Sequence, residues 1–181
     1  MAKQNPNSLV IGIDPCHENL VEISSKVLKK SSKGGLSNVL FVLASAENMS
    51  YELNNLADHV YINFPWGSLL QGIVLVRETI WNNIRQITKH NAHVEVIFGY
   101  DEKYEQKEIV RLGLPRLDQS YLSDFIIPKL ELLGFRIQSL KILTLKELQS
   151  YPTTWAKKLS YGQERQYYQM ILKVIGKAPL K

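Results

Sequence analysis

Four runs of consecutive apolar residues, rich in β-branched side chains, predict β-strands in the first part of the chain. They cover residues 8–14, 38–44, 58–64 and 92–100. Because these runs are continuous and do not alternate between apolar and polar residues, we expect each strand to be buried on both faces.

Helical spacing of apolar residues separates these runs. Leu20, Ile23 and Val27 mark one helix after the first strand, and the apolar stripe from Leu69 to Ile87 predicts a single helix of about six turns after the third. Strands that alternate with helices are typical of a parallel sheet covered by helices, so the pattern predicts the α/β class.

The second half of the chain follows a different pattern. An apolar segment at 121–133 contains Pro128, which is expected to break or kink a helix there. Two further apolar runs, at 135–143 and 165–175, are joined without a βαβ crossover, so we expect them to form an antiparallel pair at one edge of the sheet.

Length and composition favour one cytoplasmic domain. The chain has 181 residues and 45% hydrophobic content, which suits a single domain spanning 1–181. The net charge of +5 and the pI near 9.2 allow a polyanionic partner without demonstrating one. Cys16 is the only cysteine, the start does not resemble a signal sequence, and no apolar stretch approaches the ~20 residues of a membrane span.

The third predicted strand ends in Pro65-Trp66-Gly67. Pro65 has no amide hydrogen to donate, so it ends the strand and places the indole of Trp66 at its carboxyl edge, where open α/β sheets bind ligands. Core packing is the alternative role for this side chain. Trp81 lies inside the apolar helical stripe and is expected to belong to the core.

An acidic residue follows the first predicted strand. In nucleotide-binding α/β domains, such an acid ends the second strand and holds ribose hydroxyls, after a first strand and a glycine-rich turn. Asp14 suits that role, whereas MAKQNPNS at the start of the chain supplies neither feature, so we expect the fold to lack its first strand. Asp14 could also simply cap the next helix, with Pro15 at the first helical position.

Four motifs occur in an order and spacing that point to a known family. They are IGIDP, KGGLSNV, FPWG and WAKKLSYG, between about Leu9 and Lys173. With them the chain resembles the Kam/Npm-type aminoglycoside-resistance methyltransferases, which use S-adenosylmethionine to methylate ring nitrogen N-1 of a decoding-site adenine in 16S ribosomal RNA. The resemblance implies a Rossmann-like class I methyltransferase fold and the 30S ribosomal subunit as partner.

The resemblance also implies roles for individual residues. Trp66 and Trp155 would sandwich the flipped adenine, and Pro65 and Ser68 would line the methyl-transfer pocket. The residues implied to border S-adenosylmethionine are Asp14, Pro15, Ala46, Glu47, Ser68 and Thr153. Those implied to meet ribosomal RNA are Lys26, Lys29, Lys30, Lys33, Lys157, Lys158 and Arg165.

The chemistry of this reaction needs few catalytic groups. Adenine N-1 is a neutral nitrogen with an available lone pair, so positioning supplies most of the catalysis, and stacking between aromatic rings suits an extruded base. The four histidines show no metal-ligand spacing, and we expect no metal site.

Several alternatives remain open at the level of the sequence. The lysines at 26–33 could form an ordinary solvated helix face, and Gly34-Gly35 an ordinary turn. The segment NFPW is also similar to the motif of methylases that act on exocyclic amines, and a nucleotide-dependent oxidoreductase fragment would explain Asp14 alone. The chain could also be a non-catalytic remnant, because a missing central strand would leave two sheet edges unpaired.

Overall fold

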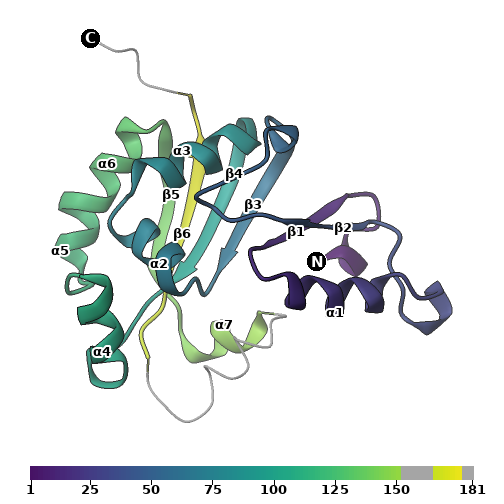
Figure 1. Ribbon diagram of the computed structural model, residues 1–181. Helices are drawn as coiled ribbons and strands as arrows, with labels where there is room; N and C mark the ends of the chain where they lie inside the picture. The colour runs from purple at the N-terminus through teal and green to yellow at the C-terminus, as the bar shows by residue number, and fades with distance from the viewer. Residues whose placement is uncertain (152–164, 177–181) are drawn as a thin grey trace. The chain divides into compact units, whose positions relative to one another are not determined.

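The computed structural model describes residues 1–151 and 165–176 (Figure 1). The chain divides into two compact units, Met1–Ser50 and Tyr51–Lys181. In the described residues each unit has its own sheet, of order β1-β2 in the first and β3-β4-β6-β5 in the second.

The first unit is a strand–helix–strand arrangement. It contains the short 3-10 turn η1 (Ala2–Gln4), β1 (Val10–Asp14), α1 (His17–Val27), η2 (Ser31–Lys33) and β2 (Val39–Leu43). β1 and β2 are parallel, with Val10 opposite Val39 and Asp14 opposite Leu43, and α1 packs on β2.

The second unit carries the larger sheet and most of the helices. Its elements are η3 (Tyr51–Leu53), β3 (Ala57–Asn63), α2 (Gly67–Val74), α3 (Glu78–Ile87), β4 (Thr88–Phe98), α4 (Glu102–Leu112), α5 (Gln119–Tyr121), η4 (Leu122–Ile126), α6 (Ile127–Leu132), β5 (Phe135–Ile142), α7 (Leu145–Ser150) and β6 (Tyr168–Val174). β3 and β4 are parallel, and β6 lies antiparallel between β4 and β5.

The sequence predicted the class and the pairing of these strands. The α/β class and the antiparallel pair β5–β6 are confirmed, with β5 as the end strand. β1 and β3 are each an end strand of their sheet, so the expected unpaired edges are present in the described strands.

The helix predicted from Leu69 to Ile87 was wrong, because the structure has two helices there. The backbone turns at Val76, whose φ is +49°, and the amide of Arg77 donates to the carbonyl of Gly72 over 2.9 Å. A Cβ on Gly72 would lie 2.0 Å from Cδ1 of the buried Ile80, so a larger residue there would force the Ile80 side chain to shift. The apolar stripe continues through this turn and therefore conceals it.

Pro128 does not interrupt the helical segment that contains it. It lies in the first turn of α6, directly after the π-helical turn η4. A π turn already departs from the regular hydrogen-bond pattern, so the missing amide of a following proline costs little there.

The main core lies between the second sheet and its helices. Trp81 of α3 is fully buried, as expected, and meets Phe135 of β5 edge-to-face with ring centroids 5.1 Å apart. Complete burial of both faces was a wrong prediction: in β4, Val94 and Val96 are buried, whereas His93 and Glu95, which alternate with them, are partly exposed.

A tight loop follows α1. The amide of Leu36 donates to the carbonyl of Val27 over 2.9 Å, and the amide of Gly35 donates to the carbonyl of Lys30. A Cβ on Gly35 would lie 1.5 Å from the carbonyl oxygen of Lys29, so this residue must be glycine. The glycine pair therefore makes a turn, which fixes the backbone of the lysine-rich segment.

We expect Gly35→Ala to open this loop, because its methyl group collides with backbone and costs at least ~2 kcal/mol locally. The measurement is hydrogen exchange at the Leu36 amide, which should lose protection. Gly34→Ala is the matched control: φ is +86° but nothing lies within 4 Å of a Cβ, so only about 1 kcal/mol of backbone strain is added. Equal effects of the two substitutions would contradict this account.

Candidate active site

The carboxyl ends of β3 and β4 are tied together just beyond their ladder. The amide of Phe64 donates to the carbonyl of Ile97 over 2.8 Å, and the Phe64 ring meets Tyr167 edge-to-face at 5.4 Å. Phe64 has a φ of +53°, a left-handed conformation that costs about 1–2 kcal/mol for a residue with a Cβ. These contacts hold the strained turn that leads into α2.

The turn presents Trp66, as the sequence predicted. Pro65 is buried, whereas 53% of Trp66 is exposed. Trp66 lines a hollow together with residues 103–108 of α4. Ser68 is exposed in the first turn of α2.

Arg165, predicted to meet RNA, is held next to this hollow by α4. Its Nη1 lies 3.2 Å from Oε1 of Glu105, and its guanidinium carbon lies 5.5 Å from the ring centroid of Tyr104. The other oxygen of Glu105 accepts the amide of Asp101 over 2.7 Å. The arginine is therefore fixed by a carboxylate and an aromatic ring, both of which line the hollow of Trp66.

Sequence reasoning missed Glu105 and Tyr104. Their signal is the run DEKYE, which begins three residues after the last residue of β4 and places acidic and aromatic side chains near the carboxyl end of a parallel strand. The backbone at Glu105 departs from helical geometry, with φ −125° and ψ 19°, and this departure had no signal in the pattern.

Tyr151 anchors the chain directly after α7. Its hydroxyl donates to Oε1 of Glu95 over 3.0 Å, and the side chain packs with Phe64 against a cluster of buried residues. Burial, together with the nearby Glu95 carboxylate, raises the pKa of Tyr151. Tyr151 therefore lies beside Phe64, and Arg165 lies beside the hollow of Trp66, so the two residues that flank the segment 152–164 are both close to the turn that presents Trp66. Thr153, Trp155, Lys157 and Lys158 lie outside the described residues.

The predicted cofactor residues of the first unit share one edge of its parallel sheet. Asp14 ends β1, and the turn 45–48, which contains Ala46 and Glu47, follows β2. The Asp14 carboxylate accepts the amide of Cys16 over 2.7 Å and also contacts the amide group of Asn19. The helix begins at His17 rather than at Pro15. Asp14 therefore orders the loop before the helix.

The predicted RNA-binding lysines of the first unit are exposed. Lys26 lies in the last turn of α1 and pairs with Glu22 at 2.6 Å, and the other three follow the helix in the tight loop and η2, so they do not continue its face. The lysines in question are Lys26, Lys29, Lys30 and Lys33. Among the described residues, no group of three or more His, Cys, Asp or Glu could hold a metal ion.

Fold and site together define an α/β domain of the ligand-binding type, with an exposed indole and a fixed guanidinium at the carboxyl edge of its parallel strands. That combination suits a flat, anionic substrate such as a nucleotide. The chain belongs to the NpmA family of 16S rRNA (adenine(1408)-N(1))-methyltransferases, whose profile matches residues 1–174.

Individual relatives agree with this assignment. A 16S rRNA (adenine(1408)-N(1))-methyltransferase from Escherichia coli is 42% identical over 171 residues, which are 94% of this chain and 78% of the relative. The crystal structure of the aminoglycoside resistance methyltransferase NpmB1 is similar with a TM-score of 0.83 and 32% identity, over 96% of this chain and 79% of that one.

A third similar structure contains a cosubstrate. It is a W203A mutant of the 16S rRNA (adenine(1408)-N(1))-methyltransferase from Catenulisporales acidiphilia with SAM, at a TM-score of 0.85 and 26% identity over 99% of this chain and 80% of that one. The resemblance found in the sequence motifs is confirmed, and so is the class I methyltransferase fold.

Replacing either partner of the pair Glu105–Arg165 should lower stability, because the pair is largely buried, with side-chain exposures of 10% and 20%. We expect a double-mutant cycle of Glu105→Gln and Arg165→Gln to give a coupling free energy of about 1–2 kcal/mol in thermal or urea unfolding. Glu108→Gln with Arg111→Gln is the matched control on the same helix, and this pair should couple by less than about 0.5 kcal/mol because its arginine side chain is 62% exposed. A coupling free energy no larger than that of the control pair would refute the conclusion that Glu105 fixes Arg165.

The capping box at the start of α7, in which Thr144 and Glu147 exchange hydrogen bonds, should be lost in acid. Hydrogen bonds from Lys141 and Thr144 lower the pKa of Glu147 from 4.5 to about 2. A lowered pKa means that the carboxylate stabilises the folded state above pH 4.5, and that this stabilisation is lost as the pH falls toward 2. A carbon NMR titration of the Glu147 carboxyl should show the low midpoint, and Lys141→Gln should raise it. A midpoint that Lys141→Gln leaves unchanged would exclude the Lys141 contact as its main cause.

Proposed function

We propose that this chain transfers the methyl group of S-adenosylmethionine to ring nitrogen N-1 of adenine 1408 in 16S rRNA and thereby gives aminoglycoside resistance. The observation that carries the proposal is a half-exposed tryptophan of the family motif FPWG, at the carboxyl edge of a parallel strand in a chain of this family. The enzyme would act on the 30S subunit in the cytoplasm, as one domain spanning 1–181.

The target base would be held by stacking. A base in folded RNA must be extruded before its ring nitrogen can be reached, and aromatic side chains stabilise the extruded base. We propose Trp66 as one face of that clamp and Trp155 as the other. The anchoring of Tyr151 beside Phe64 and of Arg165 beside the hollow of Trp66 supports this pairing, because Trp155 belongs to the segment between them.

Arg165 would hold the backbone of the extruded nucleotide. Its guanidinium is fixed by Glu105 and Tyr104, and a pre-ordered guanidinium loses little entropy when it binds a phosphate. The exposed Lys26, Lys29, Lys30 and Lys33 would contact phosphates elsewhere on the rRNA, with Lys157 and Lys158.

The cofactor would supply an activated methyl group. Asp14 and Pro15 would border its ribose, and Ala46 and Glu47 its adenine, with Thr153 close by. The donor chemistry fits, since Asp14 is an acid at the end of a parallel strand and its carboxylate has acceptor sites beyond those used by Cys16 and Asn19. Pro65 and Ser68 would line the transfer pocket. N-1 is neutral, so no side chain needs to remove a proton before attack.

The direct test is incubation of the chain with 30S subunits and tritium-labelled S-adenosylmethionine, followed by primer extension. Methylation at N-1 blocks Watson–Crick pairing, so reverse transcriptase should stop next to adenine 1408. We expect Trp66→Ala and Trp155→Ala each to lower the rate about 100-fold by misplacing the base, whereas Trp66→Phe should retain most of it. Calorimetric binding of S-adenosylmethionine should not change in these variants.

The non-catalytic remnant is the competing function. It predicts a folded chain that neither binds S-adenosylmethionine nor labels the subunit, and that result would refute the proposed activity. Labelling at a different nucleotide would refute the proposed target while leaving the methyltransferase class intact.

A further inference from the structure

One face of the second sheet is polar. Along β4 and β6 the side chains alternate: Val94 and Leu172 are buried on the face packed by helices, whereas His93 and Lys173 point to the other face and are partly exposed. Strands with this alternation are typical of a sheet with one face in water or against a polar partner. The hollow on this face and the hollow of Trp66 have no lining residue in common.

The strand register aligns four nitrogen-bearing side chains across this polar face. His59 of β3 is opposite His93 of β4, His93 is opposite Lys173 of β6, and Lys173 is opposite Arg136 of β5. Directly paired residues point to the same side of a sheet, and neighbouring strands are about 4.8 Å apart, so the row is about 14 Å long. It crosses all four strands.

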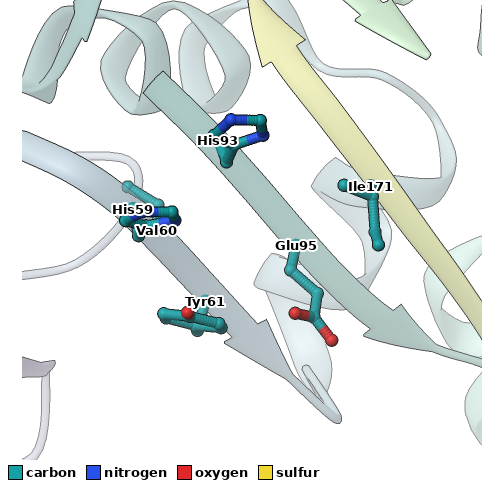
Figure 2. Close-up of a pocket in the computed structure, with 6 residues that line it drawn as sticks. All are labelled: His59, Val60, Tyr61, His93, Glu95 and Ile171. Carbon is teal, nitrogen blue, oxygen red and sulfur yellow. The ribbon is translucent and has the colours of Figure 1, made fainter. Parts of the chain in front are cut away.

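Aromatic rings lie at one end of this row (Figure 2). The rings of His59 and His93 are nearly parallel with centroids 5.4 Å apart, and those of His59 and Tyr61 are nearly parallel at 6.3 Å. Together with Glu95 and Ile171 they line a shallow hollow. Tyr61 is 45% exposed, so its ring is available for stacking.

The cations of the row are not neutralised within the described residues. Lys89 and Lys141, on the neighbouring parts of β4 and β5, pair with Asp58 and Glu147, whereas no carboxylate pairs with Arg136 or Lys173 in the part of the chain that the structure describes. Glu95, the acid in the hollow, already accepts hydrogen bonds from Tyr151 and Gln169. The row therefore offers positive charge to a partner.

We propose that this polar face of β3-β4-β6-β5 is a second RNA-binding surface, which takes single-stranded RNA with phosphates on Arg136 and Lys173 and bases on the rings of Tyr61 and His59. A four-stranded sheet that carries stacking rings and cations on one face is a common solution for binding single strands. None of these residues is among those proposed for methyl transfer, so this inference does not depend on the proposed function.

Fluorescence anisotropy with a fluorescein-labelled ten-nucleotide uridine RNA tests this proposal in a series of KCl concentrations. Each phosphate contact to a single strand contributes about 0.7 to the slope of log K against log salt, so Arg136→Gln with Lys173→Gln should flatten the slope by about 1.4. Arg116→Gln with Lys129→Gln is the matched control, since both cations are exposed and neither belongs to the row. The control should leave the slope unchanged.

The proposed stacking of bases on Tyr61 is tested by a separate substitution. Tyr61→Leu should weaken binding about tenfold at every salt concentration without changing the slope, because stacking releases no counterions. Near-ultraviolet circular dichroism identifies any variant that fails to fold, and the charge pair tests the surface even if Tyr61→Leu does fail. If the Arg136→Gln/Lys173→Gln variant and the control variant have the same slope of log K against log salt, the proposal is overturned, whatever the outcome of the methylation assay.

Discussion

The ladder that joins β3, β4 and β6 is the constraint on which the proposed site depends. It extends one residue beyond β3, where the amide of Phe64 reaches the carbonyl of Ile97. It also brings the residues just before β6 so close to Gly99 that a Cβ there would lie 2.4 Å from the carbonyl oxygen of Gln166. The backbone hydrogen bond of Phe64 and the absence of a side chain at Gly99 thus determine the positions of Trp66 and Arg165. The strained φ of Phe64 is maintained by these contacts, so the exposed indole is a product of the sheet rather than of a flexible loop.

The sequence allowed prediction of the features that depend on neighbouring residues. The end of β3 was predictable because Pro65 has no amide hydrogen to donate to a neighbouring strand, and the burial of Trp81 because a helical stripe has a fixed period. The break at Val76 was not predictable, because it depends on the packing of Gly72 against Ile80 and leaves the apolar stripe intact. The ion pair between Glu105 and Arg165 joins residues far apart in the chain, and only the folded sheet brings them together. The roles of the cofactor and RNA residues rest on motif resemblance, and they stay predictions.

The second sheet presents different chemistry on its two faces and at its edge. The face under α3 and α6 is apolar, and its buried side chains include Val94, Val96 and Leu172. The carboxyl edge collects an indole, a clamped guanidinium and a phenol, which suit a flat anionic ligand. On the opposite face, polar side chains of the four strands line up as a row of cations and aromatic rings. One ladder therefore positions groups for base stacking at its edge and for backbone contacts on its face, and both kinds of contact are used in RNA recognition.

β3 is the end strand of its sheet in the described part of the chain, so its outer backbone groups are a template for a second polypeptide and hence for aggregation. The charged pair of Asp58 and Lys89, 2.9 Å apart, stands where this strand begins. Charged groups on an end strand disfavour the approach of an identical strand, and dissolved salt weakens that protection. The ionic strength of the buffer, more than the mean hydropathy of −0.15, should therefore set the concentration at which this protein stays in solution during purification.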